Sequence, residues 1–350
     1  MAALVVVVAH LKLELMYPVP FIEWASRFVS WKGQAVDLFF ILSGFVLCHV
    51  YGFRSKIRWR SYGMARFARI YPLALATIVV LVALDAYSFL RHGIPSEQLS
   101  ATRIALNIFL LNGLKDSWVP LGINPPSWSI SVEAFLYIIA FPILTFLFIR
   151  LRQFRVPWSY WILAASILLL MGLYQYYKII PILGEHTRLL RGVLEFTAGY
   201  AMRKLYHKHE KQCIKKEPNK KFLNIIGPAA IGIGIITLAA EWPLIFLIPL
   251  LATIVYATYA DHTPLSKGLS KPLFIYLGER SYSIYLIHHF AIEFTYRVTL
   301  YPKQLADGSY PLPARLQATL GVFAVTLILS ELSLRFFENP MRDWIRRRLP

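Results

Sequence analysis

The chain has 350 residues, of which 57% are hydrophobic and only 16% are charged. Its mean hydropathy of +0.52 is far above what the surface of a soluble protein permits, so the composition excludes a soluble globular enzyme and predicts an integral membrane protein. The net charge of +18 is carried by short clusters between apolar runs, which indicates membrane topology and argues against a nucleic-acid partner.

The apolar runs predict an all-α, polytopic membrane protein. A spanning helix needs about 20 largely apolar residues. Ten runs meet or approach that length, and they are residues 1–14, 34–52, 71–90, 127–149, 158–178, 188–203, 222–240, 243–260, 281–299 and 314–337. An eleventh run, 102–113, would extend roughly 18 Å against a hydrocarbon core of about 30 Å, so we predict a re-entrant or interfacial helix there. Residues 1–350 should form a single membrane domain with no appended soluble domain.

Four basic clusters give the predicted orientation. They lie at Arg54–Arg69, Arg150–Arg155, Arg203–Lys221 and Arg342–Arg348. If the short run does not cross, all four clusters fall on one side, which the positive-inside rule assigns to the cytoplasm. Both termini are then cytoplasmic in a multi-pass protein of the cell inner membrane. The outer segments are residues 15–33, 91–126, 179–187, the turn at Glu241, and 300–313.

Three ionisable residues inside predicted spans are functional candidates, because an unpaired charge in the bilayer costs several kcal/mol. His10 ends the run "MAALVVVVAH", Asp37 begins "VDLFFILSGFVL", and Glu133 lies within "NPPSWSISVEAFLYI". The topology lets them converge, and a carboxylate bonded to one imidazole nitrogen would raise the basicity of the other. The alternatives are that His10 only packs and that Asp37 only caps its helix. Ser129, four residues before Glu133, is expected to hydrogen-bond to it.

The stretch "RFARIYP" places Arg66 and Arg69 one turn apart, with Tyr71 and Pro72 at the predicted start of span three. Guanidinium groups at i and i+3 share one helix face, where paired forks suit phosphate oxygens. The alternative is ordinary positive-inside charge with lipid-headgroup contact.

Two further motifs carry polar residues inside spans. Ser43 and Gly44 in "LSGFVL" are typical of close helix packing. In "SYSIYLIHHF" two adjacent histidines, His288 and His289, point about 100° apart, so at most one should face the interior. Neither has metal-ligand spacing, and we predict no metal site. Tyr282 and Tyr285, one turn apart, are expected to line one groove.

Together, "VDLFFILSGFVL", "RFARIYP", "PPSWSISVEAFLYI", "SYSIYLIHHF" and "FENPMRDW" resemble the acyltransferase 3 family of bacterial membrane O-acyltransferases, in order and over nearly the whole chain. The resemblance implies a ten-span domain that moves an acyl group, most commonly acetyl, from cytoplasmic acyl-CoA to a hydroxyl of a carbohydrate or glycolipid. The acceptor would belong to a surface polysaccharide, lipopolysaccharide or exopolysaccharide. Acyl-CoA is then a donor substrate, and no cofactor is bound permanently.

The resemblance also implies roles for single residues. His10 matches the family's essential first-span histidine, and Arg66 and Arg69 match its donor-holding arginine pair. The other matching positions are Ser43 and Gly44 of the SGF segment, Trp128, Ser129 and Glu133 of the segment near the active site, His288 of the ninth-span motif, and Arg191, Phe196 and Gly199 of a segment of uncertain role. The family's basic residue upstream of the histidine would fall before Met1, so we expect that the start is late or trimmed.

The predicted mechanism places the donor on Arg66 and Arg69, with Ser43 and Gly44 nearby, and makes His10 the base, oriented by Glu133. Direct attack and a covalent acyl relay both stay open. The acceptor would meet aromatic and polar side chains, namely Asp37, Trp128, Ser129, Tyr137, Tyr282, Tyr285 and His288. The rivals are a transporter or flippase with a buried His/Glu proton relay, a membrane-bound O-acyltransferase of the unrelated type, and a family member that only binds.

Overall fold

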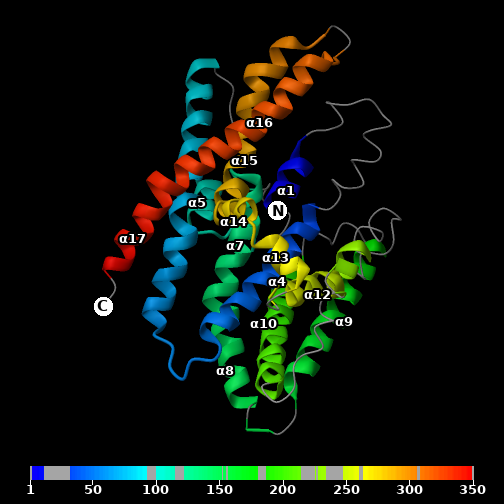
Figure 1. Cartoon of the computed structure of the whole chain (residues 1–350). Helices are drawn as coiled ribbons and strands as arrows, with labels where there is room; N and C mark the ends of the chain where they lie inside the picture. The colour runs from blue at the N-terminus through cyan, green and yellow to red at the C-terminus, as the bar shows by residue number, and fades with distance from the viewer. Residues whose placement is uncertain are drawn as a thin grey trace. The chain divides into compact units, whose positions relative to one another are not determined.

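The computed structural model describes residues 2–11, 32–92, 100–114, 122–151, 153–154, 157–179, 187–213, 225, 228–233, 247–259, 263–305 and 308–348. Within these ranges the chain is helical and contains no strand, as the apolar runs predict (Figure 1). It forms two compact units. Unit 1 comprises Met1–Lys32, Trp59–Ser131 and Leu277–Pro350, and unit 2 comprises Gly33–Arg58 and Val132–Tyr276.

Unit 1 is built around α15 (Ser281–Thr295), which packs against α1 (Ala2–His10) on one side and α16 (Leu312–Ser333) on another. The long helix α5 (Trp59–His92) packs against α17 (Asn339–Arg347). The remaining elements of this unit are α6 (Ala101–Ile108), the 3₁₀ turns η2 (Pro125–Ser127) and η7 (Tyr301–Lys303), the first half of α7 (Trp128–Phe135), and the π-helical segments η6 (Tyr296–Leu300) and η8 (Leu334–Glu338).

The central helix of unit 2 is α10 (Arg188–Cys213), and α9 (Trp158–Ile179) packs along it. Helix α12 (Leu247–Tyr259) also contacts α10. The other elements are α4 (Lys32–Tyr51), the second half of α7, the π-helical segment η3 (Leu136–Ala140), α8 (Phe141–Leu151), α13 (Pro264–Leu269) and most of α14 (Pro272–Glu279). Helix α13 begins where Thr263 caps it and Pro264 occupies its first position.

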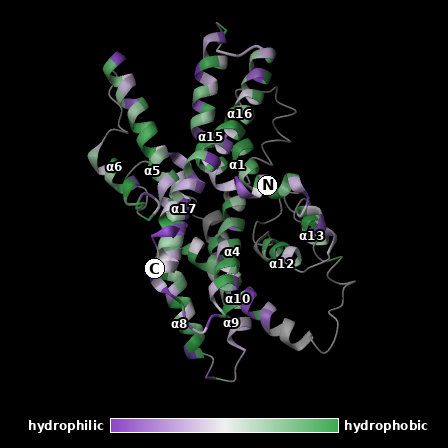
Figure 2. Cartoon of the chain, turned by 60° about the vertical axis from the view of Figure 1, so that its left-hand side comes forward, coloured by the Kyte–Doolittle hydropathy of each residue, from purple (hydrophilic) through white to green (hydrophobic). Residues whose placement is uncertain are grey.

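Three helical stretches among the described residues are long and apolar enough to cross a bilayer. They are Trp59–Arg91, Pro125–Leu151 and Leu312–Arg347. Figure 2 shows hydrophobic residues along α5 and α16, with hydrophilic residues gathered on α17. The chain is therefore an apolar, helical membrane protein. The count of ten spans and the cytoplasmic termini stay predictions.

The helix that contains the predicted span three begins well before that span. Helix α5 begins at Trp59, runs through Pro72 and includes both Arg66 and Arg69, so "RFARIYP" lies inside a helix. Its 34 residues extend roughly 50 Å at 1.5 Å per residue, well beyond a hydrocarbon core of about 30 Å. The basic first turns can therefore continue the helix outside the bilayer.

The other predicted helix boundaries agree with the structure to different degrees. Pro125 and Pro126 begin the fourth helical stretch as predicted. The short eleventh run, 102–113, contains only the eight-residue helix α6. After this helix, Leu110 adopts a left-handed backbone conformation with φ 53°. The predicted span 222–240, the segments 15–33 and 179–187, and the turn at Glu241 lie largely or wholly outside the described residues.

Each of the three π-helical segments ends two residues before a proline. Segment η3 precedes Pro142, η6 precedes Pro302, and η8 precedes Pro340. A proline inside a helix lacks the N–H for the bond to residue i−4, and its ring clashes with that carbonyl. A π turn widens the helix where the freed carbonyl lies, so the prolines account for all three segments.

Helices α4 and α10 cross at two glycines in unit 2. A Cβ on Gly44 would lie 2.0 Å from the Phe196 carbonyl oxygen, and a Cβ on Gly199 would lie 1.9 Å from the Ile41 carbonyl oxygen. Only glycine allows two helix backbones to approach this closely. The packing role expected for Gly44 is confirmed, whereas its role in donor binding stays a prediction.

Candidate active site

A pair of histidines lies at the contact between α1 and α15 in unit 1. His10 is the last residue of α1, and its Nδ1 lies 3.2 Å from Nε2 of His288. The ring centroids are 5.1 Å apart. His288 is fully buried, whereas its neighbour His289 is partly exposed, so one of the two adjacent histidines faces the interior as expected.

The hydrogen bonds of the pair determine where the protons sit. Nδ1 of His288 lies 2.6 Å from the Tyr285 carbonyl oxygen, which can only accept, so this nitrogen carries the proton. In the neutral ring Nε2 is then an acceptor facing His10. Nδ1 of His10 also lies 2.9 Å from the Val6 carbonyl oxygen, so it must be the donor. Neutral His10 is therefore unprotonated at Nε2, which is the form a general base requires.

Further hydrogen bonds fix the turn of α15 beneath His288. The Tyr285 hydroxyl lies 2.8 Å from Ser129 Oγ and donates to the Pro126 carbonyl at 3.1 Å. Asn124 donates to the Leu286 carbonyl at 2.9 Å. Ser129, which we expected to bond to Glu133, thus bonds to Tyr285. The sequence missed Asn124, although a buried amide before two prolines is a usable signal.

A pocket of about 350 Å³ lies at the N-terminal end of α15, where Ser281 and Tyr282 line it. Its walls include Arg69 from α5, Tyr282 from α15, and Asn339 and Arg342 from α17. The Tyr282 hydroxyl donates to the Ile70 carbonyl. Tyr285 is not among the residues that line this pocket and is buried against Ser129, so the shared groove expected for the two tyrosines stays a prediction.

In unit 2, Glu133 is held by Ser43 and Tyr137. Ser43 Oγ donates to Glu133 Oε1 at 3.2 Å, and the Tyr137 hydroxyl donates to the same oxygen. Tyr137 also lies 3.4 Å from Ser43. Tyr137 lies in the π-helical segment η3, and π turns are frequent at functional sites. The structure thus brings together three predicted site residues from two distant motifs.

Asp37 lies in a buried ion-pair cluster in unit 2. Its carboxylate is fully buried, with Oδ1 3.0 Å from Nη2 of Arg191, and Arg191 Nε lies 3.6 Å from the fully buried Glu195. Helix α4 begins at Lys32, so Asp37 does not cap it. Glu195 was missed from the sequence, although its spacing of four residues from Arg191 in an apolar run is the signal of such a pair.

Replacing Asp37 with leucine should lower the free energy of unfolding by about 1–3 kcal/mol, because Arg191, whose side chain is 16% exposed, loses that carboxylate and keeps Glu195 at 3.6 Å as a partner. Thermal unfolding in detergent measures the change. As a control, Arg335→Leu breaks a pair with Glu331 whose arginine is 67% exposed, and it should cost no more than about 1 kcal/mol. Unchanged stability of the Asp37 variant together with weaker acceptor binding would instead indicate a substrate role.

A second buried cation in unit 2 was not predicted. Arg203 is 4% exposed, donates from Nε to His49 Nδ1 at 3.1 Å and from Nη2 to the Tyr259 hydroxyl at 3.2 Å. Its guanidinium also lies over the rings of Phe53 and Tyr259. Cation–π contacts of this kind stabilise a desolvated arginine. The sequence signal, an arginine near the end of an apolar run, was attributed to topology.

The predicted site residues fall into separate clusters. Unit 1 contains the histidine pair with Tyr285 and Ser129, and also the arginines and Tyr282; Trp128 begins α7 there, against Gly113. Unit 2 contains the Glu133 cluster and Asp37. The predicted convergence of His10 with Asp37 and Glu133 involves both units and stays a prediction. Across the described residues, no group of three or more His, Cys, Asp or Glu side chains is placed to hold a metal ion.

The described helices are apolar, and they place the half-buried imidazole of His10 against the buried imidazole of His288 in a helical membrane protein. The acyltransferase domain family matches residues 1–331. The chain therefore belongs to the acyltransferase 3 family, in agreement with the motifs.

Two relatives illustrate the family. The chain is 24% identical to acyltransferase MdmB of Streptomyces mycarofaciens over 369 aligned positions, covering all of this chain and 91% of that protein. It is 27% identical to peptidoglycan O-acetyltransferase OatA of Listeria monocytogenes, covering 89% of this chain but only 52% of that protein. No solved structure matches significantly.

Proposed function

We propose that the protein transfers an acetyl group from acetyl-CoA to a hydroxyl of a carbohydrate or glycolipid acceptor at the inner membrane, with His10 as the general base. Family membership supports acyl transfer and favours it over the transporter alternative. The relative OatA, a peptidoglycan O-acetyltransferase, supports acetyl as the group and a carbohydrate polymer as the acceptor. The observation that carries the mechanism is the contact of His10 Nδ1 with the Val6 carbonyl and with His288 Nε2, from which we infer that Nε2 of neutral His10 is unprotonated.

In the proposed reaction, His10 Nε2 accepts the proton of the acceptor hydroxyl while that oxygen attacks the thioester carbon. The carbon–sulfur bond then breaks, and the protonated imidazole returns the proton to the departing thiolate, so the products are an ester and free CoA. His288 is a positioning residue, because its Nε2 fixes the proton on His10 Nδ1. Glu133 would orient or polarise the acceptor together with Ser43 and Tyr137.

The donor would bind with its phosphates near Arg66 and Arg69 on α5. Arg69 lines the pocket beside α15, the helix that also holds His288. A guanidinium fork matches phosphate oxygens in two parallel hydrogen bonds. Ser43 and Gly44 remain proposed donor contacts, although Gly44 is explained by packing alone.

The direct test is release of CoA thiol by the purified protein in detergent. With acetyl-CoA and solubilised peptidoglycan or polysaccharide fragments, we expect acceptor-dependent thiol release and an acetylated glycan by mass spectrometry. A transporter would release no thiol. Release of one equivalent of thiol per protein before acceptor is added would indicate a covalent relay, whereas its absence would favour direct attack.

A further inference from the structure

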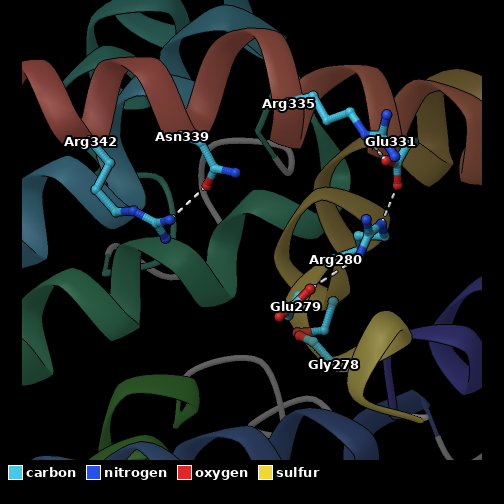
Figure 3. A network of polar contacts seen from close by, with 8 residues as sticks. Gly278, Glu279, Arg280, Glu331, Arg335, Asn339 and Arg342 are labelled. Carbon is cyan, nitrogen blue, oxygen red and sulfur yellow. Dashed lines mark hydrogen bonds and ion pairs between the residues drawn. The ribbon is translucent and has the colours of Figure 1, made fainter. Parts of the chain in front are cut away.

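The pocket beside α15 contains an arginine from the C-terminal helix whose hydrogen-bonding capacity the protein leaves largely unused. Arg342 on α17 lines the pocket and donates from Nη2 to Oδ1 of Asn339 at 2.6 Å (Figure 3). Its Nε is buried and has no hydrogen-bond partner among the described residues. A buried donor without a partner destabilises the protein, and a bound acceptor would remove that cost.

Two other arginines in this region, Arg280 and Arg335, differ from Arg342 because carboxylates neutralise their charge. Arg280 lies between Glu331, with which it forms an ion pair, and Glu279 at 3.3 Å (Figure 3). Arg335 pairs with Glu331 as well. Arg342, by contrast, is held by a neutral amide, so its charge is not cancelled by this contact.

The carboxylate of Glu338 in the same pocket is occupied by hydroxyl groups. It accepts from Ser283 at 2.5 Å and from Ser333 at 2.8 Å, both through Oε1. Ser283 belongs to α15, and Ser333 belongs to α16, which continues into the segment of Glu338. Among the described residues, Glu338 forms no hydrogen bond with Arg342. Glu338 and Arg342 therefore belong to separate hydrogen-bond networks, although both line the pocket, and the guanidinium of Arg342 can bind an external anion.

We propose that Arg342, oriented by Asn339 and placed with Arg69 in one pocket, binds a phosphate group of the donor nucleotide. This inference rests on the proposed function, because it assigns the phosphate to acetyl-CoA. The bond to Asn339 fixes the plane of the guanidinium, and Nε and Nη1 offer the remaining donors to phosphate oxygens. The pocket volume of about 350 Å³ falls in the range of small-molecule sites, which favours a nucleotide over a passing lipid headgroup.

The experiment measures CoA binding to the purified full chain in detergent by titration calorimetry. Arg342→Gln should raise the Kd for CoA roughly tenfold or more, since a charge-assisted bond is lost, and Arg342→Lys should recover only part of the affinity. The matched control is Arg346→Gln, an exposed arginine one turn further along α17, which should bind CoA like the unaltered protein. The bond of Arg342 lies within one helix, so the thermal midpoint should hardly change.

Wild-type affinity for CoA in Arg342→Gln would overturn the proposal. If that variant also copurifies with less anionic phospholipid in native mass spectrometry, the site binds a lipid headgroup and the donor assignment is wrong. Failure of the unaltered protein to bind CoA would instead refute the donor of the proposed function. That outcome is distinct, because it precedes any comparison of variants.

Discussion

Replacing His10 with alanine should reduce acetyl transfer on the order of 10²–10⁴-fold, the usual contribution of a general base. The loss should appear in kcat, because the imidazole acts on the proton that moves in the transition state. His288→Ala should also lower kcat, but less, because His10 keeps the carbonyl of Val6 as a partner for its Nδ1 proton. Thiol release from acetyl-CoA at saturating acceptor measures both effects.

The matched control is His289→Ala, which removes the adjacent imidazole on the same helix and should leave kcat nearly unchanged. All three variants should show the same thermal midpoint within a few degrees, so that loss of fold does not account for loss of activity. Full turnover by a well-folded His10→Ala protein would eliminate His10 as the base and with it the proposed mechanism.

Substituting Gly199 with alanine should destabilise unit 2 by about 3 kcal/mol, at the upper end of overpacking effects. The added Cβ would meet the Ile41 carbonyl oxygen at 1.9 Å and the Phe45 nitrogen at 3.0 Å. Both atoms belong to the backbone of α4, so no side-chain rotation relieves the clash, and the two helices must separate. Thermal unfolding in detergent and the yield of monodisperse protein measure the loss.

Gly172→Ala on α9 is the control for the same change in helix propensity. Nothing lies within 4 Å of a Cβ at that position, so alanine should be neutral or should stabilise by about 0.5–1 kcal/mol. Equal stability of the Gly172 and Gly199 variants would mean that α4 and α10 do not make the close crossing.

The sequence predicts helix positions well where apolar residues alone decide them. The stretch Pro125–Leu151 starts at its proline pair, and α9 and α10 begin within a residue of the predicted spans. It fails where a helix continues beyond the apolar run. Helix α5 includes the basic residues from Trp59 onward, because arginine is a good helix former and charge pattern marks only the membrane boundary.

The sequence identifies the individual residues of the candidate site but not the contacts between them. His10, Glu133 and Asp37 stand out because ionisable groups are rare in apolar helices. Their partners depend on tertiary packing. His10 meets His288 across 278 residues, and Ser43 meets Glu133 across 90. Asp37 pairs with an arginine from another helix, so its burial reflects an ion pair that no local pattern contains.

The π turns before Pro142, Pro302 and Pro340 also bear on how distant relatives should be aligned. A π turn accommodates one more residue than an α turn. A relative without the proline has no need of the extra residue. Alignments at 24–27% identity should therefore place single-residue gaps within Leu136–Ala140, Tyr296–Leu300 and Leu334–Glu338, and residues beyond them, such as Arg342, then keep their helix face across the family.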